Sequence, residues 1–197
     1  MRGTPWGSAI SEMDADARLQ EYEDNLDRHY YREAITELRA SGLGHSHLLG
    51  YLRKEIDHRN IVNLLRALRQ GLPVEQRMDA MLDGGSTLKG SLLKSAAEAD
   101  SQDALIEVLR RSNMDTAELE EKLEESNDHG GFDPVVSYLA EERRSDMRRM
   151  SHLNPLSAFP IIYYLESKVI EVQNLRLLVR GKAVDLPDDV IEAHMTF

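Results

Sequence analysis

The chain has 197 residues and a mass of 22.4 kDa, enough for one large domain or two small ones without disulfides. It contains no cysteine, which excludes disulfide frameworks, thiolate zinc sites and cysteine nucleophiles. The formal net charge of -11 repels phosphate backbones, so the composition argues against a nucleic-acid partner.

Most of the positive charge is arginine, because the lysines are few. They are Lys54, Lys89, Lys94, Lys122, Lys168 and Lys182. An acidic, lysine-poor surface indicates a halophilic source, since high salt screens a large net charge. An ordinary acidic cytosolic protein is the alternative that composition leaves open.

The residue pattern predicts an all-α fold, because strand-like alternation of apolar and polar residues is absent. Residues 1–18 combine Gly, Pro and Ser and are expected to be an irregular segment. Glycines and prolines then delimit the helices. The predicted helices are 19–39, 47–70, 73–84, 86–99, 101–111, 115–126, 134–150, 159–182 and 187–194, with a break at 127–131.

Two of these helices carry long apolar stripes at helical spacing, and such stripes bury against other helices. The first stripe comprises Leu48, Leu52, Ile56, Leu64, Leu65 and Leu68. The second comprises Ile161, Leu165, Val169, Val172, Leu175 and Val179. Charged residues interrupt the second stretch, so it is predicted to be a buried helix rather than a membrane span.

An internal repeat is the most informative feature of the sequence. The matched residues, all at one constant offset, are Ile56 with Ile170, Asp57 with Glu171, Asn60 with Asn174, Leu64 with Leu178, Arg66 with Arg180, Leu72-Pro73 with Leu186-Pro187, and Met81 with Met195. The repeated unit is a helix, a long helix, a Leu-Pro turn and a short helix. Stacked units of this kind share a core, so residues 19–130 and 131–197 are predicted to be two helical repeat units, packed together or forming one domain.

Four residues of the repeat are candidate site residues. Asn60 and Asn174 each lie on an apolar stripe, where a polar amide must find hydrogen-bond partners. We expect each to bond the backbone of a neighbouring helix; a contact with a ligand or partner subunit is the alternative. Arg66 and Arg180 lie near helix ends, where a cation complements the helix dipole. The sequence suggests no catalytic, cofactor-binding or metal-binding residue.

The repeat also carries a family resemblance. The run 163–182, followed by Leu186-Pro187, resembles the C-terminal signature of the C subunits of archaeal and vacuolar-type ATPases, the vacuolar d subunit family. The run 51–61, with Leu64-Leu65-Arg66, is similar to that family's preceding repeat. The match extends over most of residues 20–197.

The resemblance implies an all-helical subunit built from related units around a funnel-like centre. Such a subunit is a non-catalytic part of the central stalk, peripheral to the cytoplasmic face of the membrane. Its partners are the rotating shaft subunits and the membrane proteolipid ring, and it couples the two during proton or sodium transport without a cofactor. Family members have three repeated units, and about two are visible here, so the chain is expected to be a fragment of a longer subunit.

Other chemistry has weak support. Neither a G-x-x-x-x-G-K-[ST] loop nor a G-x-G-x-x-G fingerprint occurs, so no nucleotide site is indicated. His45, His47 and His58, with Asp57, form no metal-ligand spacing, and we interpret the histidines as solvated.

Two charge clusters remain. Glu118, Glu120, Glu121, Glu124 and Glu125 predict a solvated helix face. Alternatively they bind a basic partner, which would make the protein a helical adaptor or regulatory module. The second cluster is Arg143, Arg144, Arg148 and Arg149. These arginines are expected to pair with acidic residues of their own helix, the alternative being an acidic partner surface or anionic lipid heads.

Overall fold

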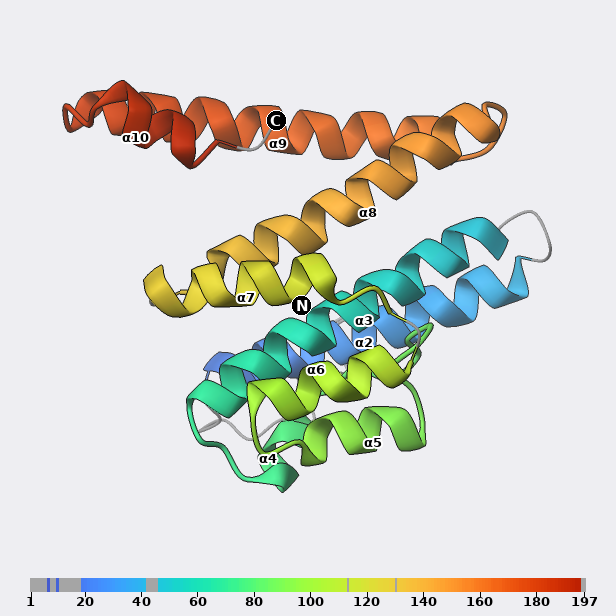
Figure 1. Cartoon of the computed structure of the whole chain (residues 1–197). Helices are drawn as coiled ribbons and strands as arrows, with labels where there is room; N and C mark the ends of the chain where they lie inside the picture. Colours follow the sequence, from blue (N-terminus) through green and yellow to red (C-terminus); the bar gives the residue numbers. More distant parts are fainter. Residues whose placement is uncertain are drawn as a thin grey trace. The chain divides into compact units, whose positions relative to one another are not determined.

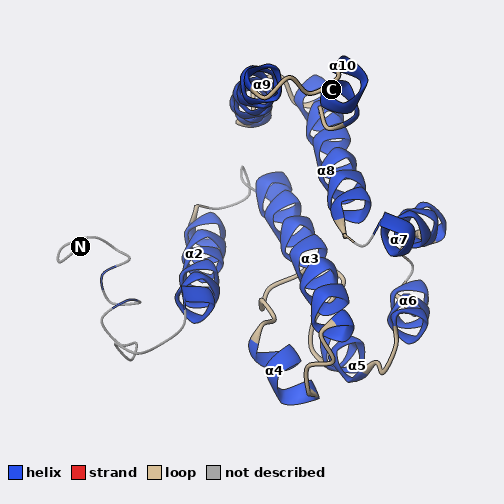
Figure 2. Cartoon of the chain, turned by 90° about the vertical axis from the view of Figure 1, so that its left-hand side faces the viewer, coloured by secondary structure: helices blue, strands red, loops and turns tan. Residues whose placement is uncertain are grey.

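A computed structural model describes residues 7, 10, 19–41, 46–112, 114–129 and 131–195. This part of the chain contains helices and loops and no strand (Figure 2), which confirms the predicted all-α class. No helix in it is long and apolar enough to cross a membrane. The helices are α2 (Leu19–Ala40), α3 (Ser46–Arg69), α4 (Val74–Asp79), α5 (Ser91–Glu98), α6 (Gln102–Arg111), α7 (Ala117–His129), α8 (Asp133–Leu153), α9 (Phe159–Ala183) and α10 (Asp188–Ala193).

The chain divides into two compact units, residues 1–139 and residues 140–197, with the division inside α8. The predicted irregular segment 1–18 lies outside the described residues apart from positions 7 and 10. The predicted repeat boundaries, 19–130 and 131–197, refer to copies of a sequence pattern and stay a prediction.

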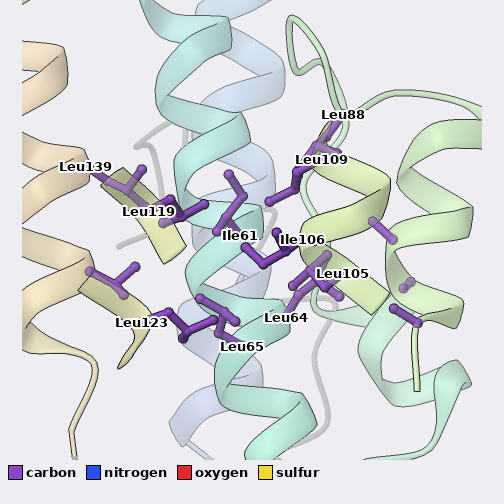
Figure 3. Close-up of a cluster of buried hydrophobic side chains, with 14 of the residues drawn as sticks. Ile61, Leu64, Leu65, Leu88, Leu105, Ile106, Leu109, Leu119, Leu123 and Leu139 are labelled. Atoms are coloured by element: carbon purple, nitrogen blue, oxygen red, sulfur yellow. The ribbon is translucent and has the colours of Figure 1, made fainter. Parts of the chain in front are cut away.

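Helix α3 forms the centre of the first unit. Its residues Ile61, Leu64 and Leu65 are fully buried, as the apolar stripe predicts. Figure 3 shows them facing leucines of α6 and α7 and Ile106 of α6. Burying each such side chain contributes about 1.5–3 kcal/mol, so this cluster is the main source of stability in the unit.

Helix α2 packs on α3 through a second, smaller cluster. Tyr31 and Ile35 of α2 contact Leu52 and Ile56 of α3. The Tyr31 hydroxyl donates a hydrogen bond of 2.7 Å to Glu55 Oε1. Burial, and then the neighbouring Glu55 charge, raise the pKa of Tyr31, so the hydroxyl stays protonated and remains the donor.

The structure corrects several predicted helix ends, and α8 continues to Leu153, beyond the predicted end at residue 150. Helix α4 ends at Asp79 and α5 begins at Ser91, so residues 80–90 form a loop where the sequence suggested helix. Gly84 and Gly90 within this loop have φ values of 103° and 55°, which an α-helix excludes. Helix α7 continues to His129, through part of the predicted break, because residues 117–129 include neither Gly nor Pro.

The turn after α3 recurs after α9 with the same backbone geometry. The Leu72 N–H donates to the Ala67 carbonyl at 3.0 Å. The Leu186 N–H donates to the Gly181 carbonyl, also five residues earlier, at 2.9 Å. The preceding residues, Gly71 and Asp185, have φ values of 66° and 54°. Pro73 and Pro187 then occupy the N-cap positions of α4 and α10, so the Leu-Pro element of the sequence repeat is a repeated helix-ending turn.

The apolar stripe of α9 differs from the prediction that it is buried. Of the residues of α9, all of which the structure describes, Phe159 and Gly181 alone are buried. The exposed residues include Ile161, Leu165, Val169, Val172, Leu175 and Val179. The physical reason is a shortage of neighbours: the α10 segment, which folds back along one end of α9 (Figure 1), is too short to cover a 25-residue helix.

Candidate functional site

Asn60 lies fully buried on α3 and holds the loop 80–90. Its Nδ2 donates to the Leu82 carbonyl at 2.9 Å, and its Oδ1 accepts from the Leu82 N–H at 2.8 Å. The amide therefore satisfies both backbone groups of one residue. Its partner lies in a loop, whereas the sequence suggested a neighbouring helix.

Asp57, one helical turn before Asn60, fixes the next part of the same loop. Its carboxylate accepts three backbone N–H bonds, from Ser86 at 3.0 Å, Thr87 at 2.7 Å and Leu88 at 3.0 Å. Burial raises the pKa of the Asp57 carboxyl, and the three N–H donors partly offset that rise. We call Asp57, Asn60 and their backbone partners in residues 82–88 the loop anchor.

The sequence pattern presented Asp57 as the repeat counterpart of Glu171 and as a companion of nearby histidines, without a structural role of its own. A signal for its role was nonetheless present, because an acidic residue lay one turn from Asn60 on an apolar helix. A Gly84-Gly85 pair follows α4, the next helix along the chain. Buried carboxylates require donors, and a glycine-rich loop is able to present several backbone N–H groups to one oxygen pair.

Gly85 allows the loop to approach α3. A Cβ atom at this position would meet Asp57 Oδ1 and would lie 2.7 Å from the Leu88 carbonyl oxygen. Neither atom is the flexible end of a side chain that can turn away, since one belongs to the loop anchor and the other to backbone. Only glycine fits here without movement of the loop.

Substituting Gly85 by alanine is therefore expected to lower the free energy of unfolding by about 1–3 kcal/mol, as overpacking does. Gly50 is the matched control, because a Cβ there meets nothing within 4 Å. Gly50 lies in α3, so Gly50→Ala is expected to raise stability by about 1 kcal/mol. Denaturant unfolding of both variants measures the two effects, and equal values for both would contradict the proposed fit.

The histidines do not share one environment. His58 is buried, not solvated as expected, and its Nδ1 lies 3.1 Å from the Leu139 carbonyl oxygen. A carbonyl only accepts, so Nδ1 carries the proton. His47 is exposed and His45 lies outside the described residues. Within the described ranges, no three His, Asp or Glu side chains are grouped to hold a metal ion.

The other candidate site residues are not part of the loop anchor. Asn174 of α9 is half-buried and lines a groove of about 290 Å³ together with Ile170, Glu171, Leu175 and Leu178. Arg66 and Arg180 are exposed in the last turns of α3 and α9, where their charge complements the helix dipole. Within each unit, the structure thus does not bring the arginine into a site with the asparagine of its own helix.

The two charge clusters are largely accounted for within the chain. Arg144 pairs with Glu141 at 2.6 Å and Arg149 with Asp146 at 3.1 Å, which confirms intrahelical pairing for these two arginines. In the acidic run, Glu120 pairs with Arg110 of α6 at 2.6 Å. The exposed members Glu118, Glu121 and Glu124 form a solvated face of α7, as predicted.

A basic groove lies beside α2 in the first unit. It has a volume of about 570 Å³, and Arg28, Arg32 and Arg39 line it together with the loop residues from Met81 to Gly84. All three arginines are exposed. Three arginines line the groove against one carboxylate, that of Asp83, so it offers positively charged side chains to an acidic partner.

Comparison with known proteins gives one consistent result. Residues 1–194 match the family described as ATP synthase (C/AC39) subunit. Similar proteins include the A-type ATP synthase C subunit of Archaeoglobus fulgidus, 30% identical over 98% of this chain and 54% of the relative. The corresponding subunits of Halorubrum lacusprofundi (28%, over 98% and 54%) and Methanococcoides burtonii (27%, over 97% and 52%) are similar too. The chain spans about half the length of these relatives, and no solved structure matches it significantly.

Proposed function

The chain belongs to the ATP synthase (C/AC39) subunit family, and from that membership we propose that it is a central-stalk subunit of an A-type ATP synthase. The observation that carries the proposal is the family match over residues 1–194, supported by the repeated helical unit. In this role the protein is not an enzyme. It couples the rotating shaft of the soluble motor to the membrane proteolipid ring during proton or sodium transport.

The geometry suits a part that transmits force. Helix α3, about 36 Å long at 1.5 Å per residue, is buried between α2 and the helices α5 to α7. The loop anchor joins the loop 80–90 to this helix through hydrogen bonds from buried side chains. A close-packed interior of this kind has low compressibility and transmits strain.

The proposal places the protein on the cytoplasmic face of the membrane, as a peripheral subunit. The central shaft subunits and the proteolipid ring are its proposed partners, and nucleic acid is not one. The arginine-lined groove beside α2 is a candidate contact for an acidic partner surface. The acidic, lysine-poor composition suits a halophilic source, in which these contacts form at high salt.

Co-purification tests the proposal directly. We expect the full chain, tagged in its source organism and purified from membranes in mild detergent at native salt, to recover other ATP synthase subunits. The proteolipid should be among them, and the isolated chain should hydrolyse no ATP. A tagged acidic protein of similar size controls for adhesion. Recovery of no ATP synthase subunit under these conditions would reject the stalk proposal.

A second candidate function rests on the exposed glutamates of α7. Glu118, Glu121 and Glu124 lie within two turns of one helix and are able to bind a basic partner, as an adaptor would require. Changing all three to glutamine separates the two functions. Loss of the recovered partners would favour the adaptor, whereas unchanged recovery of ATP synthase subunits would favour the stalk.

A further inference from the structure

Equivalent positions of the two repeats have opposite exposures. On α3, Ile61, Leu64 and Leu65 are fully buried under residues 88–123. The repeat pairs these positions with Leu175, Leu178 and Val179 of α9, which are 54%, 37% and 67% exposed. Exposed apolar side chains that cluster on one face mark a binding surface.

The groove on α9 lies where the first unit has its loop anchor. Its lining residues Glu171, Asn174 and Met195 correspond by the repeat to Asp57, Asn60 and Met81. In the first unit, the loop that follows Met81 reaches Asp57 with its backbone N–H groups. The groove of about 290 Å³ therefore has the residue types that hold such a loop, and it is open.

Charge indicates what kind of segment fits. The segment that covers α3, residues 80–129, contains twelve Asp and Glu residues and five Lys and Arg residues. Helix α3 has the opposite balance, with five basic and two acidic residues. Helix α9 resembles α3, with four basic and two acidic residues. A complementary partner for α9 is thus acidic as well as amphipathic.

We propose that this face of α9 docks an acidic, leucine-rich helical segment that lies outside residues 1–197. The segment packs on Leu175, Leu178 and Val179 as residues 88–123 pack on α3. Glu171 Oε2 already accepts a hydrogen bond from Lys168 Nζ at 2.5 Å, so a loop at the start of the segment donates backbone N–H groups to Glu171 Oε1, as residues 86–88 do to the Asp57 carboxylate. A second copy of the chain is a poorer occupant, because its own acidic segment is already packed on its own α3.

A binding experiment with a defined probe tests the proposal. The probe is a fluorescein-labelled peptide with the sequence of residues 80–129, which stands in for the acidic segment, and the receptor is the full chain. We expect saturable binding, and we expect Leu175→Glu to weaken it at least tenfold. Ile161→Glu is the matched control, since Ile161 is an apolar residue of α9 with a comparable exposure, 65% against 54% for Leu175, and corresponds to the exposed His47. It should leave the affinity unchanged.

Further controls make the outcome unambiguous. A peptide with Leu105→Glu and Leu109→Glu should not bind, because these leucines contribute the apolar face. Helix content by circular dichroism checks that both receptor variants fold. The proposal is wrong if the peptide does not bind, if Leu175→Glu leaves binding intact, or if the chain dimerises and Leu175→Glu abolishes the dimer. The test involves no other motor subunit, so its failure is distinguishable from failure of the stalk proposal.

Discussion

Replacing Asp57 by alanine is expected to lower the free energy of unfolding by about 3–5 kcal/mol, because hydrogen bonds to charged groups and unsatisfied buried donors are each worth about 1–3 kcal/mol. Three backbone N–H groups, of Ser86, Thr87 and Leu88, lose their acceptor together. The loop cannot simply turn its N–H groups to water, since the Leu88 side chain is fully buried in the main core. Loss of this one carboxylate therefore loosens both the loop and the core beneath it.

The Asp57→Asn variant tests whether stability depends on the shape of the side chain or on its two acceptor oxygens. Asp57→Asn keeps the size of the side chain, but its amide nitrogen would face N–H donors of the loop. We expect it to be nearly as destabilising as alanine. Asp83 lies exposed in the same loop, so Asp83→Asn should change stability by less than about 0.5 kcal/mol. Urea unfolding measures all three variants, and a near-native Asp57→Asn would show that the carboxylate is not required.

Asn60→Leu is expected to cost about 2–4 kcal/mol, the second largest effect. The leucine is apolar and of similar size, but it leaves both the N–H and the C=O of Leu82 unsatisfied in a buried site. Asn60→Asp is predicted to be destabilising as well, since it keeps the acceptor for the Leu82 N–H and loses the donor to the carbonyl. Asn60 therefore contributes to the free energy of unfolding by pairing both backbone groups of Leu82 at once.

Asn63, on the same helix, provides the control for Asn60. Its Nδ2 makes one long hydrogen bond of 3.3 Å to the Ala80 carbonyl in a half-buried position. Asn63→Leu should therefore cost less than about 1 kcal/mol. Thermal and denaturant unfolding of the two leucine variants give the comparison. Equal losses would mean that the buried pairing at Leu82 has no special role.

The local pattern of the sequence was sufficient to predict most of the helices and the core face of α3. Helical periodicity depends on residues that are close in sequence, so the buried stripe from Leu52 to Leu65 follows from the spacing of the apolar residues alone. The Leu-Pro turns were predictable for the same reason, because proline restricts its own backbone. The asparagine of the loop anchor was recognised as a polar residue on an apolar stripe.

Tertiary contacts explain what the sequence did not reveal. Residues 80–90 include Met81 and Leu82, which favour helix locally, but the distant Asp57 and Asn60 hold them in an irregular path. The stripe on α9 was predicted to be buried because periodicity reports that a helix has an apolar face. Periodicity does not report whether the same chain supplies a partner for that face. The described residues leave the α9 stripe exposed.

The loop anchor also changes how residues 82–88 respond to thermal motion. Irregular segments usually open independently of the core and exchange their amide hydrogens quickly. Here the amide hydrogens of Leu82, Ser86, Thr87 and Leu88 point into side chains of the central helix. Their release requires the loop to separate from α3, so this stretch, which has no helix of its own, belongs to the slowly exchanging part of the protein.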